Sequence, residues 1–123
     1  MASNKTLRMG PVALAAAAAN IVNPPTLTGG TGLAGTNTAT YLILRHIRIV
    51  NKTAGAVSAT LYVGATGGSA AGTEFGFNAT PIPANSYVDW YGMLRLDTAD
   101  FLTGLASAAT SLTFEAEGEI GVA

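Results

Sequence analysis

Short segments in which apolar and polar residues alternate are the feature that most restricts the fold of this chain. Successive side chains of a strand point to opposite faces of a sheet, so a period of two is typical of a strand with one buried face. In residues 57–63, valine, alanine and leucine alternate with serine, threonine and tyrosine. Residues 41–50, 87–97 and 112–117 are further predicted strands, and no segment sustains a helical period.

Glycine- and proline-containing turns separate these predicted strands. Residues 51–55 are predicted to turn the chain between 41–50 and 57–63, so that the two segments form a hairpin. In the first of them, Tyr41, Ile43, Ile47 and Ile49 are expected on one face. In residues 87–97, Val88, Trp90, Gly92, Leu94 and Leu96 are expected to face inward, and Tyr87, Asp89, Tyr91, Met93 and Arg95 outward. The predicted fold class is all-β, an antiparallel β-sandwich with either jelly-roll or immunoglobulin-like wiring.

The first 40 residues differ from the rest in composition. Residues 1–40 are interpreted as an extended N-terminal arm followed by a Gly/Thr-rich loop, and residues 41–123 as the β-sandwich domain. The diproline at 24–25 favours an extended path, because the residue before a proline avoids the helical region. The alanines at 15–19 leave a short helical turn open as an alternative.

The charge content favours a protein that works in contact with neighbours. Only 11% of the residues are charged, against about 25% in an average soluble domain, and a weakly charged surface is poorly protected against association. The basic residues, except Arg95, precede residue 53, whereas all seven acidic residues lie at Glu74 or beyond. Either the basic and acidic parts of adjacent copies attract each other, or the opposite charges neutralise each other within one sandwich.

The side chains offer little recognisable catalytic chemistry. The absence of cysteine excludes disulfides and thiolate metal sites, and the single histidine, His46, is interpreted as a polar strand residue with no nucleophile motif to serve. Asp97 and Asp100 are expected to bond backbone amides rather than calcium. We therefore expect no enzymatic activity, no cofactor and no metal. The basic residues are too few for a surface that binds nucleic acid. No apolar run reaches the length of about 20 residues that a membrane span needs. We therefore expect neither nucleic acid nor a membrane as a partner.

Two groups of apolar residues are candidates for an assembly interface. The first lies in the predicted arm, whose apolar side chains are expected to be too many for so small a domain to bury. The second lies on the outer face of residues 87–97. Alternatively, the second group forms a ligand-binding surface on which the tyrosines stack against a sugar. The candidate interface residues are Leu7, Met9, Val12, Leu14, Ile21, Val22, Tyr87, Tyr91 and Met93.

Several segments resemble small β-sandwich virion proteins of tailed bacteriophages, over about residues 41–122. They are Ile47–Thr53, Thr60–Gly64, Ile82–Ser86, Leu94–Asp97 through Asp100–Leu102, and Glu117–Ile120. The resemblance implies a non-enzymatic structural protein of the head or tail, and it transfers no functional residues.

Among these roles, the predicted arm and the small domain favour capsid decoration. The expected location is the outer surface of the phage head, where the protein would stabilise the shell. Its expected partners there are the major capsid protein and other copies of itself, as a trimer. A minor tail or baseplate component, or a host- or glycan-binding adhesin module, is the alternative.

Overall fold

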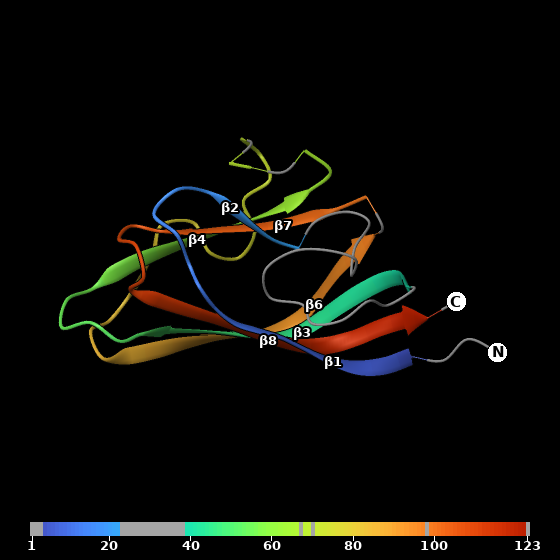
Figure 1. Cartoon of the computed structure of the whole chain (residues 1–123), viewed down its shortest axis with the longest axis horizontal. Helices are drawn as coiled ribbons and strands as arrows, with labels where there is room; N and C mark the ends of the chain where they lie inside the picture. Colours follow the sequence, from blue (N-terminus) through green and yellow to red (C-terminus); the bar gives the residue numbers. More distant parts are fainter. Residues whose placement is uncertain (1–3, 23–38, 67, 70, 98, 123) are drawn as a thin grey trace.

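The computed structural model describes residues 4–22, 39–66, 68–69, 71–97 and 99–122 (Figure 1). These residues form two four-stranded antiparallel sheets that pack face to face, which confirms the predicted all-β sandwich. No helix in the described part could span a membrane. The first sheet has the order β1 (Asn4–Ala13), β8 (Leu112–Val122), β3 (Ala39–Asn51), β6 (Ser86–Asp97). The second has the order β2 (Ala19–Val22), β7 (Phe101–Ala106), β4 (Val57–Gly64), β5 (Thr80–Ile82).

The strand pairing resolves the wiring of the sandwich. β1 pairs with β8, β2 with β7, β3 with β6 and β4 with β5, and successive pairs alternate between the two sheets. This is the pairing of one long hairpin rolled into two layers, which is the wiring of an eight-stranded jelly roll. In an immunoglobulin sandwich the first two strands would share a sheet, whereas here β1 and β2 lie in different sheets.

The predicted hairpin of β3 and β4 is wrong, because the two strands lie in different sheets. The buried side chain of Asn51 shapes the connection between them. Its amide donates hydrogen bonds of 2.9 Å to the carbonyl oxygens of Gly55 and Ile82, and its Oδ1 accepts one of 2.9 Å from the amide of Thr53. Alternation shows which face of a strand is buried, but it does not show which strand lies beside it.

A β-bulge in β3 changes which residues face the core. The register of β3 shifts between Leu44 and His46 against both β8 and β6. The extra residue reverses the alternation, so that Leu42 and Leu44 are buried before it and Ile47 and Ile49 after it. The prediction for Ile47 and Ile49 is confirmed. For Tyr41 and Ile43 it is wrong, because they do not share the buried face of Ile47 and Ile49: Leu42 and Leu44 occupy that face before the bulge.

A glycine in β8 permits the close approach of the two strands beside this bulge. A Cβ atom on Gly118 would lie 1.9 Å from the carbonyl oxygen of Ile43 and 2.8 Å from the Cα of Leu44. Both are backbone atoms, so no side-chain rotation could relieve the clash. Residue 118 must therefore be glycine for β3 and β8 to pair in this register.

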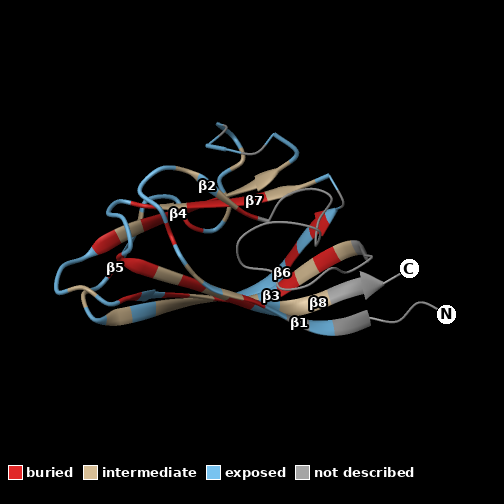
Figure 2. Cartoon of the chain, viewed as in Figure 1, coloured by how far each residue is buried: buried red, intermediate tan, exposed pale blue. Residues whose placement is uncertain are grey.

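The described part of the predicted arm belongs to the sandwich. β1 and β2 pair with β8 and β7, and the side chains of Met9, Leu14 and Ile21 are buried in the core with exposures of 3% or less. Buried residues occur in strands of both sheets (Figure 2). The interpretation of residues 4–22 as a separate arm is therefore corrected: these apolar residues complete the core of their own chain and are not available to a neighbour. Val12 is partly buried and packs against the same core.

Other parts of the arm prediction lie outside the described residues. These are residues 1–3, the segment 23–38 with most of the Gly/Thr-rich loop, and the side chains of Leu7 and Val22, whose backbones are in β1 and β2.

Substitution of Met9 tests whether β1 contributes to the core. Met9→Ala is expected to lower the free energy of unfolding by about 2–5 kcal/mol, because a fully buried methionine leaves a cavity when truncated. Met93→Ala is the matched control: that side chain is 65% exposed, and its loss should cost no more than about 0.5 kcal/mol. Urea denaturation of both variants measures the difference, and equal stabilities would show that β1 is dispensable.

Candidate functional site: the outer face of the first sheet

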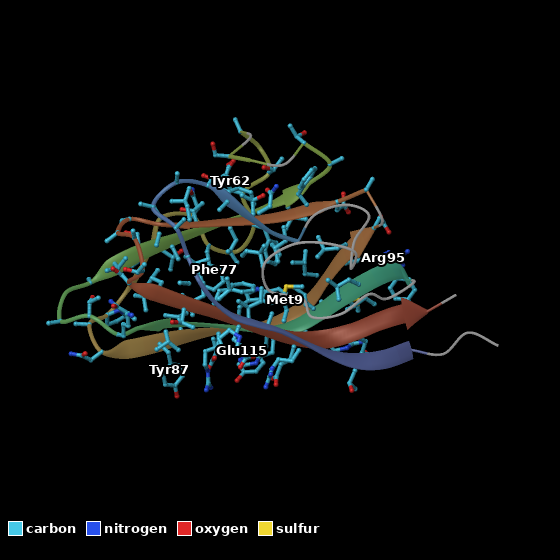
Figure 3. All side chains as sticks on the ribbon, in the orientation of Figure 1. Met9, Tyr62, Phe77, Tyr87, Arg95 and Glu115 are labelled. Carbon is cyan, nitrogen blue, oxygen red and sulfur yellow. The ribbon has the colours of Figure 1, made fainter. Side chains whose placement is uncertain are left out.

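The face of the first sheet that points away from the core carries most of the ionisable side chains that the structure describes. Figure 3 shows Tyr87 and Glu115 on this side, while Met9 and Phe77 lie between the sheets. We call this surface the outer face. Its described members that carry the argument below are Arg8, Arg45, His46, Arg48, Tyr87, Asp89, Tyr91, Met93, Glu115, Glu117 and Glu119.

His46 is at the centre of this surface, and each of its ring nitrogens faces a carboxylate. Nε2 is 2.9 Å from Oδ1 of Asp89 on β6, and Nδ1 is 3.3 Å from Oε1 of Glu117 on β8. The ring of Tyr91 stacks on the imidazole at a centroid distance of 4.7 Å and an angle of 17°. Hydrogen bonding to Asp89, supported by Glu117 and opposed by partial burial, raises the pKa of His46.

Asp89 is held in place by an arginine. Arg48 donates from Nε to Oδ1 at 2.7 Å and from a terminal nitrogen to Oδ2 at 3.0 Å, a bidentate geometry that fixes the carboxylate in orientation. These hydrogen bonds, with a smaller contribution from His46, lower the pKa of Asp89 to about 2. The guanidinium of Arg48 also stands over the ring of Tyr87, 4.3 Å from its centroid.

The charged residues of the two halves of the chain are paired within the sandwich. β3 carries Arg45 and Arg48, and it lies between two strands from the acidic half, β8 and β6. Arg45 donates to Glu119 on β8 at 2.7 Å, and Arg48 pairs with Asp89 on β6. Of the two explanations for the charge division, neutralisation within one sandwich is thus confirmed for these pairs.

Glu115 lies beside this network, and its Oε1 takes no part in the hydrogen bonds described above. It is opposite Arg48 in the register of β8 and β3, yet its Oε1 is buried and accepts no hydrogen bond. His46, Glu115 and Glu117 each offer one potential metal-ligand atom, and these three atoms lie within 4.8 Å of one another. An open groove of about 570 Å³ crosses the same region and is lined by Thr6, Arg8, Arg45, His46, Glu117, Gly118 and Glu119.

The three candidate interface residues of β6 are exposed on the outer face. The exposed fractions are 71% for Tyr91, 65% for Met93 and 53% for Tyr87, as the alternation in residues 87–97 predicts. The structure therefore separates the nine candidates: these three lie on one surface, whereas Met9, Leu14 and Ile21 lie in the core.

Sequence reasoning missed the network around His46. The alternation placed Asp89 outward and the sequence marked His46 as the only histidine, but neither observation indicates that β3 lies between β6 and β8. Only a test of the alternative strand pairings for charge complementarity could have found the network from the sequence. The expectation for Asp100 is confirmed, because its Oδ2 accepts a 2.8 Å hydrogen bond from the amide of Asp97.

The contacts of His46 in this arrangement are with charged groups. Within the described residues, the hydrogen bonds of both His46 nitrogens go to carboxylates and none to a serine or threonine hydroxyl. A general base needs its substrate hydroxyl within hydrogen-bonding reach. The chain matches no protein-family model and no curated protein sequence.

The raised pKa of His46 is directly measurable, because the chain has a single histidine. An NMR titration should give a pKa above the usual 6.5, and Asp89→Asn should lower it by removing the main hydrogen-bonding carboxylate. Asp97→Asn, at the far end of β6 opposite Tyr41, is the control and should leave the pKa unchanged.

The same shift predicts how stability depends on pH. A group whose pKa is higher in the folded than in the unfolded state stabilises the fold fully below the unfolded pKa, and this contribution disappears as the pH rises through the folded pKa. His46→Gln should therefore cost more stability at pH about 5.5 than at about 8.5. An equal cost at both values would contradict the assigned direction.

Proposed function

We propose that the chain is a non-enzymatic structural subunit of a phage virion, which joins neighbouring proteins through its outer face. The observation that carries the proposal is the exposure of Tyr87, Tyr91 and Met93 along β6. Aromatic residues and methionine are enriched where proteins meet, and exposed large apolar side chains in one area mark interaction sites.

Two further features support this role. The jelly-roll wiring occurs in viral capsid proteins, although lectins and cupins share it and a fold does not by itself assign a function. β6 is the last strand in the order of its sheet and is 12 residues long. The backbone of such an edge strand can accept a strand from another protein. Because residues 4–22 belong to the sandwich, we assign to β6 the contact with a neighbouring protein that was first expected of the arm.

Within the virion, we favour capsid decoration over a tail or baseplate position. The proposed partners are the major capsid protein and two further copies of this chain. The weakly charged composition, with 11% charged residues, suits a subunit whose surface is largely covered by such neighbours.

Self-association of the purified chain tests the assembly surface. The wild type is expected to form trimers at about 100 μM in analytical ultracentrifugation. The double variant Tyr91→Ser, Met93→Ser is expected to be monomeric because it loses the largest exposed apolar groups. An unchanged melting temperature would show that the variant still folds.

A wild type that stays monomeric at that concentration would contradict self-assembly through this face. Immunogold labelling of virions then reports location: label over the heads is expected, and label confined to tails would reassign the protein to the tail.

The stacked pair of Tyr91 and His46 favours glycan binding as a second candidate. Tyr91 presents an open ring face beside carboxylate and guanidinium groups, a combination of an apolar platform and polar groups that suits a sugar. Binding to a glycan array should disappear in Tyr91→Ala and persist in Met93→Ala, because only the aromatic ring offers a stacking surface. Equal glycan binding by Tyr91→Ala and the wild type would exclude this candidate.

A further inference from the structure

We propose that His46, Glu115 and Glu117 form a binding site for a divalent transition-metal ion, with Zn²⁺ as the best match. One potential ligand atom of each residue lies within 4.8 Å of the other two. Imidazole nitrogen and carboxylate oxygen are both ligands that Zn²⁺ accepts. The proposal rests on the geometry of the outer face and holds whether or not the chain is a virion protein.

The distance between His46 and Glu117 fits two ligands of one metal ion. Nδ1 and Oε1 are 3.3 Å apart, which is long for a charge-assisted hydrogen bond of about 2.7–2.9 Å. With Zn–N and Zn–O bonds of about 2.0–2.2 Å and a tetrahedral angle, two ligand atoms are separated by about 3.4 Å. The two side chains therefore need little movement to bind the same ion.

The other ring nitrogen of His46 is oriented as metal-binding histidines require. Nε2 lies 2.9 Å from Asp89, whose carboxylate is held by both hydrogen bonds from Arg48. A carboxylate that accepts the second N–H of a ligand histidine fixes its tautomer and directs the free nitrogen toward the metal. The two hydrogen bonds from Arg48 hold the Asp89 carboxylate in the orientation that this role needs.

Glu115 provides a second, independent observation. Its Oε1 is buried and has no hydrogen-bond partner, although buried polar atoms are nearly always satisfied and an unsatisfied one is costly. A bound cation beside His46 and Glu117 would satisfy this oxygen. The lack of a partner is thus explained by the same ion that the first two ligands fit.

The charge balance of the outer face leaves room for a cation. Arg45 and Arg48 are engaged with Glu119 and Asp89. Arg8 lies opposite Glu117 in the register of β1 and β8 and lines the groove, so it is the cation with which the metal ion would compete. Two of the three proposed ligands, His46 and Glu117, line the open groove, so water or an incoming ligand would have access to a further coordination position.

Calorimetric titration of the tag-free full-length chain with zinc chloride tests the site. One ion per chain is expected to bind. Glu115→Gln and His46→Gln should each weaken binding at least about tenfold, and Asp89→Asn should weaken it about 10- to 100-fold through the orientation of His46. The matched control is Glu119→Gln, on the same strand and face, which should change affinity by less than about threefold because it is not a ligand.

A second readout separates coordination from a general loss of structure. Zinc is expected to shift the ¹⁵N resonance of His46 at Nδ1, with Nε2 remaining protonated. Glu115→Gln keeps the shape of the side chain, and circular dichroism checks that it folds. Absence of binding at about 1 mM zinc, unchanged affinity in Glu115→Gln, or a zinc-induced shift at Nε2 would each overturn the proposal.

Discussion

The pairing of β3 with both β8 and β6 is the constraint on which the rest of the structure depends. One face of β3 supplies Leu42, Leu44, Ile47 and Ile49 to the core, and the other supplies the basic groups of the outer face. Because both neighbouring strands come from the acidic half of the chain, every basic group on β3 has a carboxylate within reach. Hydrophobic burial thus positions the charges, since surface ion pairs alone stabilise a fold very little.

The bulge in β3 links the core to the outer face. Without the extra residue near Arg45, strict alternation would place either Leu42 and Leu44 or Ile47 and Ile49 on the solvent side. The same shift sets His46 opposite both Glu117 and Tyr91. Gly118 makes this local geometry possible, because only a residue without a Cβ fits against the backbone of β3 at that point. The extra residue of β3 against β8 and the extra residue of β6 against β3 therefore determine together which side chains surround the histidine.

The proposed activities of the outer face share residues and would influence one another. Tyr91 is an exposed candidate for assembly or glycan contact, and its ring stacks on His46, the central ligand of the proposed metal site. A metal ion that fixes the imidazole would also fix the platform on which Tyr91 rests. A partner that covers Tyr91 would in turn exclude water from the ion and strengthen its electrostatic interactions. Binding at either place is therefore expected to favour binding at the other.

The amino-acid sequence by itself determined the strand class and most of the facing of residues 57–63 and 87–97, because a period of two depends only on neighbours along the chain. It also determined that the basic residues before position 53 can form ion pairs only with acidic residues of the second half of the chain. Only the tertiary structure decided that β1 and β2 complete the core, that the wiring is a jelly roll, and that His46 meets Asp89 and Glu117. These features depend on which strands lie side by side and on the register shifts between them. Contacts between residues 43 and 71 positions apart, as His46 makes with Asp89 and Glu117, leave no local pattern in a sequence.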